Sequence, residues 1–467
     1  MLARILFLLT ALLSAVAASP AFADPPGRVG RISLISGSVG MRSADDSEPR
    51  GAVTNWPVTS GDNVWTGRGA RAEIRVGSTA LRLDSESEIE ITRLDDDALQ
   101  VRLVVGSMAV RIRHPEPARE FELTTTHGRM LTLEPGSYRF DHAEDLTSAS
   151  VYQGSLRFEG AGTALNVRAG DRADIWNAGT LTYQIEQPRR DDFYNWSLAR
   201  DRRDDASGSA RYVSPEMTGY EDLDEYGRWD DSADYGPVWY PRSVPAGWAP
   251  YRWGHWAWVS PWGWTWIDDS PWGFAPFHYG RWVMVGGLWG WAPGTIVRRP
   301  VYAPALVAWV GRPGWSVSIR AGSAPAVGWF PLAPREVYVP AYRCSPAHVR
   351  NVNITHVTDV TRITHVVRVT EANRAHEEIR HMHRHRPEAV TVVAADVVQR
   401  GSPVRHAAVP VRDMRTINAL PVAAAAPSVA APRHQREHRR PDAEPGHGAP
   451  AALSGRSPRS AEPPAAA

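Results

Sequence analysis

The stretch Arg71-Ala72-Glu73-Ile74-Arg75-Val76-Gly77-Ser78 contains the pattern that decides the fold of the first third of the chain. Charged and apolar residues alternate over six positions, as they do in a strand that buries one face. The Gly-Ser pair that follows marks a tight turn, because glycine adopts a positive φ at little steric cost. We therefore expect an all-β domain over residues 28–183. Within it the alternation recurs, and Gly-Ser also stands at 37–38, 106–107, 136–137 and 154–155.

Several segments of this domain, taken in order, resemble the periplasmic FecR-type domain. In typical members of that family, one membrane helix joins the domain to a cytoplasmic segment that binds a sigma factor. The resemblance implies a role in relaying a signal from an outer-membrane receptor through a membrane partner. The segments that carry it are Gly30 to Val39, Val58 to Gly67, Ala72 to Ser78, Val101 to Met108, Phe121 to Thr126, Tyr152 to Leu156 and Val167 to Asp171.

A secretory signal peptide is predicted over residues 1–23, where a FecR-type protein would carry its cytoplasmic segment and membrane helix. Arg4 precedes an almost unbroken apolar run from Ile5 to Ala18, and Ala21-Phe22-Ala23 supplies a small–x–small cleavage pattern. The alternative is an uncleaved anchor, but the run is shorter than the ~20 residues that span a bilayer. We expect cleavage after Ala23, export to the periplasm or cell exterior, no later transmembrane segment and no direct anti-sigma role.

The composition of the whole chain narrows the possible partners. The 52 basic residues are all arginine and balance 51 acidic residues, which leaves a net charge of +1. This near-neutrality argues against a nucleic-acid-binding protein. Cys344 is the only cysteine, so no intrachain disulfide can form and no cysteine near Ala23 can carry a lipid. An envelope protein or a cell-wall glycan remains as the expected partner.

Three further segments are predicted to lack a packed core. Residues 184–214 mix aspartate with arginine and contain Ser207-Gly208-Ser209, which indicates an acidic, disordered linker. Residues 346–399 are rich in Val, Thr and His and predict an extended arm. The Ala/Pro/Arg-rich tail, 400–467, shows no periodicity and is expected to be disordered.

The region 215–345 is dominated by tryptophan. Tyr226-Gly227-Arg228-Trp229, Trp253-Gly254-His255-Trp256 and Tyr279-Gly280-Arg281-Trp282 recur at spacings of 27 and 26 residues, and a second aromatic cluster follows each of them. We interpret them as three degenerate β-hairpin repeats that stack in series, because one such repeat cannot bury its own face. The fold class expected for the chain is therefore all-β: a FecR-like domain, a Trp-rich hairpin domain and a disordered tail.

The Trp-rich region also resembles part of an uncharacterised family of exported bacterial proteins that often carry a FecR-type domain in front. This resemblance implies the architecture but no activity. It is carried by Val213 to Tyr220, Pro271 to Gly280, Pro304 to Val307 and Val327 to Leu332.

The tryptophans are the leading candidates for ligand binding. Flat indole rings suit sugar rings and other planar or cationic partners. The alternative is that they form the core, since this region contains few Leu, Ile or Val and an aromatic side chain buries about 150–250 Å². Both interpretations remain open from the sequence. The candidate ligand-binding residues are Trp256, Trp264, Trp266, Trp282 and Trp291.

Two further groups of residues, the paired aspartates and a cluster of histidines, suggest catalysis and metal binding less strongly. Asp268-Asp269 and Asp230-Asp231 could supply a glycosidase pair, although Asp-Asp-Ser-Pro is more typical of a turn. The histidines could hold a metal if they were helical, but a solvated basic patch is the simpler interpretation. They are His376, His381, His383 and His385.

No fingerprint of a nucleophile, phosphate loop or dinucleotide site is present. We therefore expect a non-enzymatic protein without cofactor or metal. Its most favoured function is an envelope binding or scaffold module for a glycan or protein. A FecR-like signalling component is the alternative, and a glycan hydrolase comes third.

Overall fold

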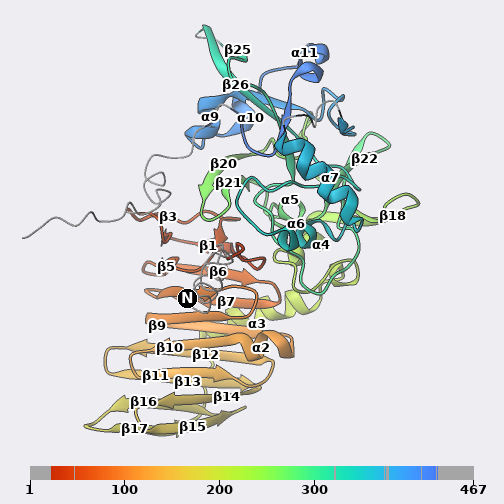
Figure 1. Ribbon diagram of the computed structural model, residues 1–467. Coiled ribbons are helices and arrows are strands. Elements are labelled where there is room, and N and C mark those ends of the chain that lie inside the picture. The colour runs from red at the N-terminus through yellow and green to blue at the C-terminus, as the bar shows by residue number, and fades with distance from the viewer. Residues whose placement is uncertain are drawn as a thin grey trace, which may run out of the picture. The chain divides into compact units, whose positions relative to one another are not determined.

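The computed structural model describes residues 23–46, 48–319, 322–372, 374, 378–411, 413–427 and 429. All of them fall in one unit, residues 1–430. Strands dominate, as the sequence predicted (Figure 1). The predicted signal peptide up to residue 22 and most of the predicted tail lie outside the described residues. No helix in the described part of the chain combines the length and apolar character needed to cross a membrane.

The FecR-like domain consists of two sheets that share one long strand, β9. Its first half pairs with β8 and its second half with β7 and β12. All pairings are antiparallel except that of β9 with β10. The first sheet runs in the order β4 (Pro57–Val58), β1 (Gly30–Ser36), β6 (Arg71–Val76), β7 (Thr79–Leu83), β9 (Leu99–Ile112), β12 (Gly136–Ala143), β13 (Leu146–Gln153), β16 (Arg172–Asn177) and β17 (Leu181–Glu186).

The second sheet lies face to face with the first. It packs its apolar face against the first sheet, and the two faces share one hydrophobic core. Short helix α2 (Pro115–Glu120) follows β9. The strand order is β3 (Arg50–Gly51), β2 (Val39–Arg42), β5 (Asn63–Thr66), β8 (Glu88–Leu94), β9, β10 (Phe121–Thr125), β11 (Gly128–Thr132), β14 (Ser155–Gly160) and β15 (Thr163–Arg168).

The alternation in β6 explains the core of this domain. Ala72, Ile74 and Val76 are fully buried between the sheets. Glu73 and Arg75 project from the opposite face, which was expected to meet solvent, yet they are buried as well. The segment 184–214 covers the side chains of Glu73 and Arg75. The predicted disorder of that segment is wrong, because it contains helix α3 (Asp192–Asp205).

The Trp-rich region contains an antiparallel hairpin at each of the three aromatic motifs. These are β18 (Gly227–Ser232) with β19 (Gly236–Pro241), β20 (Gly254–Val259) with β21 (Gly263–Asp268), and β22 (Arg281–Val285) with β23 (Leu288–Ala292). The hairpins do not stack in chain order, as had been expected. The first and third share one sheet, in which Trp239 pairs with Trp291, and the second forms a sheet of its own.

The glycine in each motif has a packing reason. A Cβ on Gly227 would lie 2.1 Å from Cε2 of Trp239, on the returning strand of the same hairpin. A Cβ on Gly254 or Gly280 would likewise crowd Trp266 or Trp291. In each hairpin the returning indole therefore occupies the space that a side chain at the glycine would need, which accounts for the recurrence of aromatic-Gly-x-Trp.

The remaining described elements correct the predictions for residues 346–467. The described part of the expected extended arm holds helices α6, α7 and α9 and strand β27, and the described part of the expected tail contributes a strand that pairs with β24. The elements outside the FecR-like domain and the hairpins are η1 (Ser209–Arg211), η2 (Tyr220–Asp222), α4 (Leu223–Tyr226), α5 (Ala275–His278), β24 (Val307–Val310), β25 (Ser316–Ile319), β26 (Gly322–Pro331), α6 (Pro346–Asn353), α7 (Val360–Glu371), β27 (Thr391–Ala394), α9 (Ala395–Gln399), α10 (Val404–Ala407), α11 (Met414–Ala419) and β28 (Val422–Ala423).

Candidate functional site

Four of the five tryptophans predicted to bind a ligand belong to the core. Trp256, Trp266 and Trp291 have no exposed surface, and Trp282 is 1% exposed. A ligand could not reach these rings, so the prediction is wrong for them. Trp264 is half-buried and packs edge-to-face on Trp258, with 5.4 Å between ring centroids. The large indoles fill the interior because the hairpins supply few other apolar side chains.

The acid pairs do not frame a reaction centre. Asp268 is 2% exposed; it accepts hydrogen bonds from Nε1 of Trp266 at 3.0 Å and from the backbone N–H of Ser270 at 2.9 Å. Burial raises its pKa to about 7. Asp269 is exposed, and Asp230 and Asp231 are exposed on β18. Asp268 is therefore a single buried carboxyl group that orders the turn after β21.

Two of the predicted histidines, His381 and His383, are buried and do not form a solvated patch, whereas His385 is exposed. His383 is fully buried, with Nε2 2.9 Å from the carbonyl oxygen of Trp282. His381 lies with Nδ1 3.2 Å from Oε2 of Glu336. Residues 381–386 form turns and not a helix, and His376 lies outside the described residues. Within the described ranges no group of three potential metal ligands comes together.

Helix α3 is the element that creates the candidate site. The side chain of Asp191 caps it by accepting a hydrogen bond from the backbone N–H of Tyr194 at 3.0 Å, and Arg202 and Arg203 occupy its last turn. Both features favour a helix, since the cap satisfies a free donor and the arginines match the helix dipole. The residues that it buries recur every three or four positions: Phe193, Ser197, Asp201 and Asp204.

Helix α3 and the residues after it cover the outer face of the first sheet through what we call the buried ion network. It joins five arginines to five carboxylates, and Arg203, at its edge and 38% exposed, also pairs with Glu225. Such pairing offsets the large cost of removing charges from water. The members are Arg31, Arg75 and Arg82 from the sheet, Arg200 and Arg203 from α3, and the acids Glu73, Asp201, Asp204, Glu221 and Asp222.

Glu73 is the centre of this network. It has no exposed surface, and its carboxylate lies 2.9 Å from Nε of Arg75, 2.7 Å from Nε of Arg82 and 2.6 Å from Nε of Arg200. Burial alone would raise the pKa of Glu73. The three guanidinium groups outweigh burial and hold that pKa well below its ordinary value.

The network also joins the FecR-like domain to the start of the Trp-rich region. Arg31 on β1 pairs with Asp222, and Arg75 lies 3.5 Å from Glu221. Thr218 accepts a hydrogen bond from the N–H of Gly77 and donates one to the carbonyl oxygen of Val29, both at 2.9 Å. These contacts link residues more than 140 positions apart. The two regions are therefore packed together through charges at their junction.

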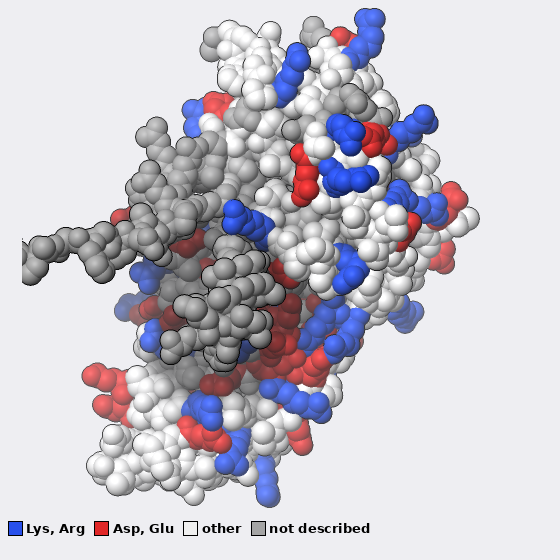
Figure 2. Space-filling view, viewed as in Figure 1, with Lys and Arg blue, Asp and Glu red and all other residues white. Residues whose placement is uncertain are grey.

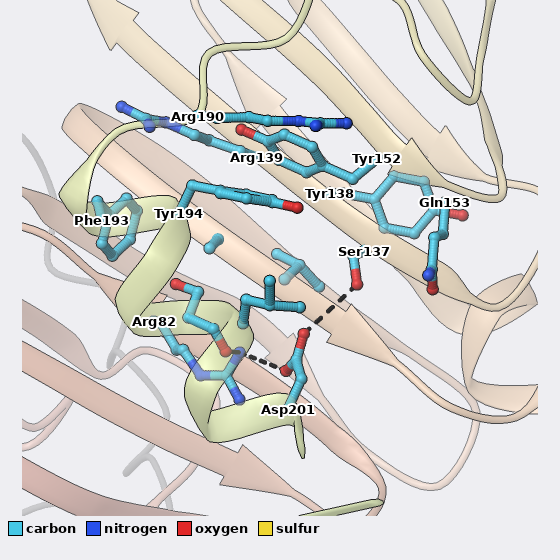
Figure 3. A pocket seen from close by; sticks show the side chains of 14 residues that line it. Arg82, Ser137, Tyr138, Arg139, Tyr152, Gln153, Arg190, Phe193, Tyr194 and Asp201 are labelled. Atoms are coloured by element: carbon cyan, nitrogen blue, oxygen red, sulfur yellow. Dashed lines mark hydrogen bonds and ion pairs between the residues drawn. The ribbon is translucent and has the colours of Figure 1, made fainter. Parts of the chain in front are cut away.

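Next to the network, α3 and strands β9, β12 and β13 enclose a groove of about 220 Å³ (Figure 3). Tyr152 and Tyr194 lie along one side, with ring centroids 4.5 Å apart, and Asp201 lies on the opposite side. Arg190 lies over the ring of Tyr194 at 5.9 Å. These residues could not be found from the sequence, because they belong to a helix and strands far apart in the chain.

Most polar side chains that line the groove already bind other side chains of the protein. Arg82 binds Asp201 at 2.6 Å, and Arg139 contacts both Asp141 and Asp191. Ser197 is the exception. It is 7% exposed, and its Oγ has no hydrogen-bond partner among the described residues. A buried hydroxyl without a partner costs free energy, but this Oγ has almost no accessible surface, so a ligand contacts it only if a neighbouring side chain moves.

The chain is similar to known proteins at the level of families and of structures. The search of curated proteins gave no match. Two crystal structures of a candidate anti-sigma factor from Parabacteroides distasonis ATCC 8503 are 13% and 12% identical to this chain, with TM-scores of 0.26 and 0.25. The matches cover 29% and 39% of this chain; it spans 64% of the first of these structures and 99% of the second.

Two family models match different parts of the chain. Residues 62–157 match the model described as FecR protein. Residues 220–336 match the model of a family of unknown function, DUF6600. Both resemblances predicted from the sequence are confirmed: the chain carries a FecR-type domain followed by a DUF6600 region.

Proposed function

We propose that this protein is a non-catalytic envelope protein that binds a small neutral ligand, one sugar residue in size, in the groove beneath α3. The observation that carries the proposal is a groove of about 220 Å³ walled by the rings of Tyr152 and Tyr194, beside the unpartnered Oγ of Ser197. Aromatic walls with a few polar groups are typical of small-molecule sites. The match to FecR, a family of envelope proteins, supports export to the periplasm or cell exterior.

The size and charge of the groove favour this ligand class. A volume of about 220 Å³ corresponds to roughly seven water molecules and is smaller than the ~300–1,000 Å³ of sites for drug-sized ligands. Arg82 and Arg139 are already paired with carboxylates, and Arg190 lies over the ring of Tyr194, so the groove offers an anionic ligand at most one guanidinium. Gln153 and Ser137 also line the groove, and both already accept hydrogen bonds from Arg111.

Binding is favoured over glycoside hydrolysis because the lining contains a single carboxylate, Asp201. Hydrolysis usually needs two carboxyl groups on either side of the scissile bond. Asp201 is also held by Arg82 at 2.6 Å, so its carboxylate is already engaged by a protein partner.

Calorimetric titration with neutral monosaccharides and N-acetylated amino sugars tests the proposal. Tyr194→Ala removes a wall and should weaken binding by at least ten-fold, and Ser197→Ala by a smaller factor. Tyr235→Ala changes a half-buried tyrosine in the β18–β19 hairpin and should leave affinity unchanged. The proposal fails if the wild-type chain binds none of these sugars at millimolar concentration, or if Tyr235→Ala weakens binding as much as Tyr194→Ala.

A FecR-like signalling role is the second candidate, and the match over residues 62–157 favours it. Helix α3 lines the groove and also carries Arg200 and Asp204 of the ion network. A ligand could therefore be sensed through the stability of α3. Hydrogen exchange should slow across α3 when a ligand is bound, and in-cell crosslinking should capture a membrane protein on the FecR-type domain. Unchanged exchange together with no membrane partner would argue against this role.

A further inference from the structure

The FecR-type domain ends in two edge strands that lie at the same end of its sheets (Figure 1). Among the described strands, β17 pairs only with β16 and β15 only with β14. Each edge strand therefore presents a row of backbone N–H and C=O groups that no neighbouring strand satisfies. Such a row is a template for one more strand.

At this end of the sheets, the hydrophobic core between them is only partly covered. Tyr183 pairs in register with Ile175, and Ile185 with Ala173, so all four point toward the interior side of the sheet. Ile175 and Ala173 have no exposed surface, whereas Tyr183 is 46% and Ile185 is 44% exposed. The difference arises because no further layer lies beyond β17. Leu181, at the start of this strand, is also only half-buried.

The opposite end of the same sheets is covered by the chain itself. Val58 on edge strand β4 is fully buried and Trp56 is 4% exposed. Nδ2 of Asn55 donates hydrogen bonds to the carbonyl oxygens of Asp268 and Ser270, at 3.0 and 2.7 Å. The exposed apolar surface at β17 is therefore a property of one end only, and the Trp-rich region covers the other.

Strand β17 also lacks the devices that usually protect an edge. Its sequence, Leu-Thr-Tyr-Gln-Ile-Glu, contains no proline, no glycine and no basic residue, and its register with β16 is regular over all six residues. Proteins commonly block edges with prolines, bulges or inward charges. The surface around this end carries few charged side chains in the view of Figure 2.

We propose that β17 pairs with β17 of a second copy of this chain, so that the two sandwiches share one continuous core. The strand is self-complementary in an antiparallel arrangement about a two-fold axis at Gln184. Tyr183 then lies opposite Ile185 of the second copy, and Thr182 opposite Glu186, so no like charges face each other. Twofold pairing of identical patches is the commonest form of oligomer.

Analytical ultracentrifugation of the full chain over a concentration series tests the dimer. Ile185→Lys places a charge in the shared core and should raise the dimer dissociation constant at least ten-fold. Leu288→Lys is the matched control, because Leu288 is 57% exposed at the β22–β23 turn, away from this end. Circular dichroism should show that both variants stay folded. A wild-type chain that remains monomeric at 100 μM would overturn the proposal.

A crosslink tests the register independently of folding. In a Cys344→Ser background, Gln184→Cys places two thiols on the axis, where facing Cβ atoms are about 4.5–5.5 Å apart, within reach of a short bifunctional thiol crosslinker. Thr182→Cys in the same background lies off the axis and should not crosslink. Equal crosslinking at both positions, or a stable complex only with a different protein, would contradict pairing between copies.

Discussion

The buried ion network and the Trp-rich region bury large side chains by two different means. Under α3, five arginines and five carboxylates neutralise each other, and Glu73 at the centre contacts three guanidinium groups. In the hairpins, neutral indoles fill the space, and Trp256 packs on Trp309 and Trp329 at 4.4 and 5.3 Å between centroids. A charge is stable in the interior only with all its partners, whereas an indole needs mainly a matching shape. Stability should therefore depend sharply on single charges in one region and on volume in the other.

The largest expected effect is in the network. Glu73→Ala leaves Arg75, Arg82 and Arg200 without their shared partner, and breaking a buried pair typically costs about 3–5 kcal/mol. We expect urea unfolding to show a loss of that size. Glu159→Ala is the matched control, since Glu159 also contacts two arginines but at the surface, and it should change stability little. Equal losses would show that the network has no special role.

The aromatic region should respond to volume. Gly227→Ala forces a Cβ to within 2.1 Å of the Trp239 indole, and overpacking of this kind costs about 1–3 kcal/mol. Gly51→Ala, at a site with no atom within 4 Å, should have almost no effect. Thermal unfolding of both variants checks this. If Gly227→Ala were neutral, the packing explanation of the aromatic-Gly-x-Trp motif would be wrong.

The two regions should also differ in their response to pH. The pKa of Glu73 is lowered, so its stabilising contribution is lost as the pH falls below its ordinary value of 4.5. The pKa of Asp268 is raised from 3.8 to about 7, so the folded state binds more protons between these values and stability falls as the pH rises toward 7.

Asp268→Asn isolates the second effect. It removes the titrating carboxyl group and should flatten the decrease in unfolding free energy between pH 5 and pH 8, a change on the order of 1–2 kcal/mol. Asp269→Asn, at the exposed neighbouring position, should leave the slope as it is. Denaturant titrations at four pH values would measure it, and a wild-type profile that is flat over this range would show that burial does not raise the pKa of Asp268.

The contrast between the two regions also explains which parts of the fold and of the site could be predicted from the sequence. The β-domain was predictable because alternation such as Ala72, Ile74, Val76 reports directly on a buried face. The hairpins were predictable from local motifs, but their order in space was not, because the Trp239–Trp291 pairing joins strands about 50 residues apart. Helix α3 and the groove were missed since Asp201 and Asp204 look like a solvated charge run until Arg75 and Arg82 are brought beside them. Charge pairing across the fold leaves no local pattern.

The smallest expected effect concerns the start of α3. Asp191→Ala removes the N-cap and one partner of Arg139, and loss of such a cap costs about 1 kcal/mol. Asp192→Ala, one residue later, removes an equal charge that provides no cap and should cost less. Because α3 walls the groove, the Asp191 variant should also raise hydrogen exchange in the first turn of the helix. If both variants behaved alike, net charge and not the cap would hold the start of α3 against the sheet. The buried ion network would then depend on fewer specific contacts than the structure indicates.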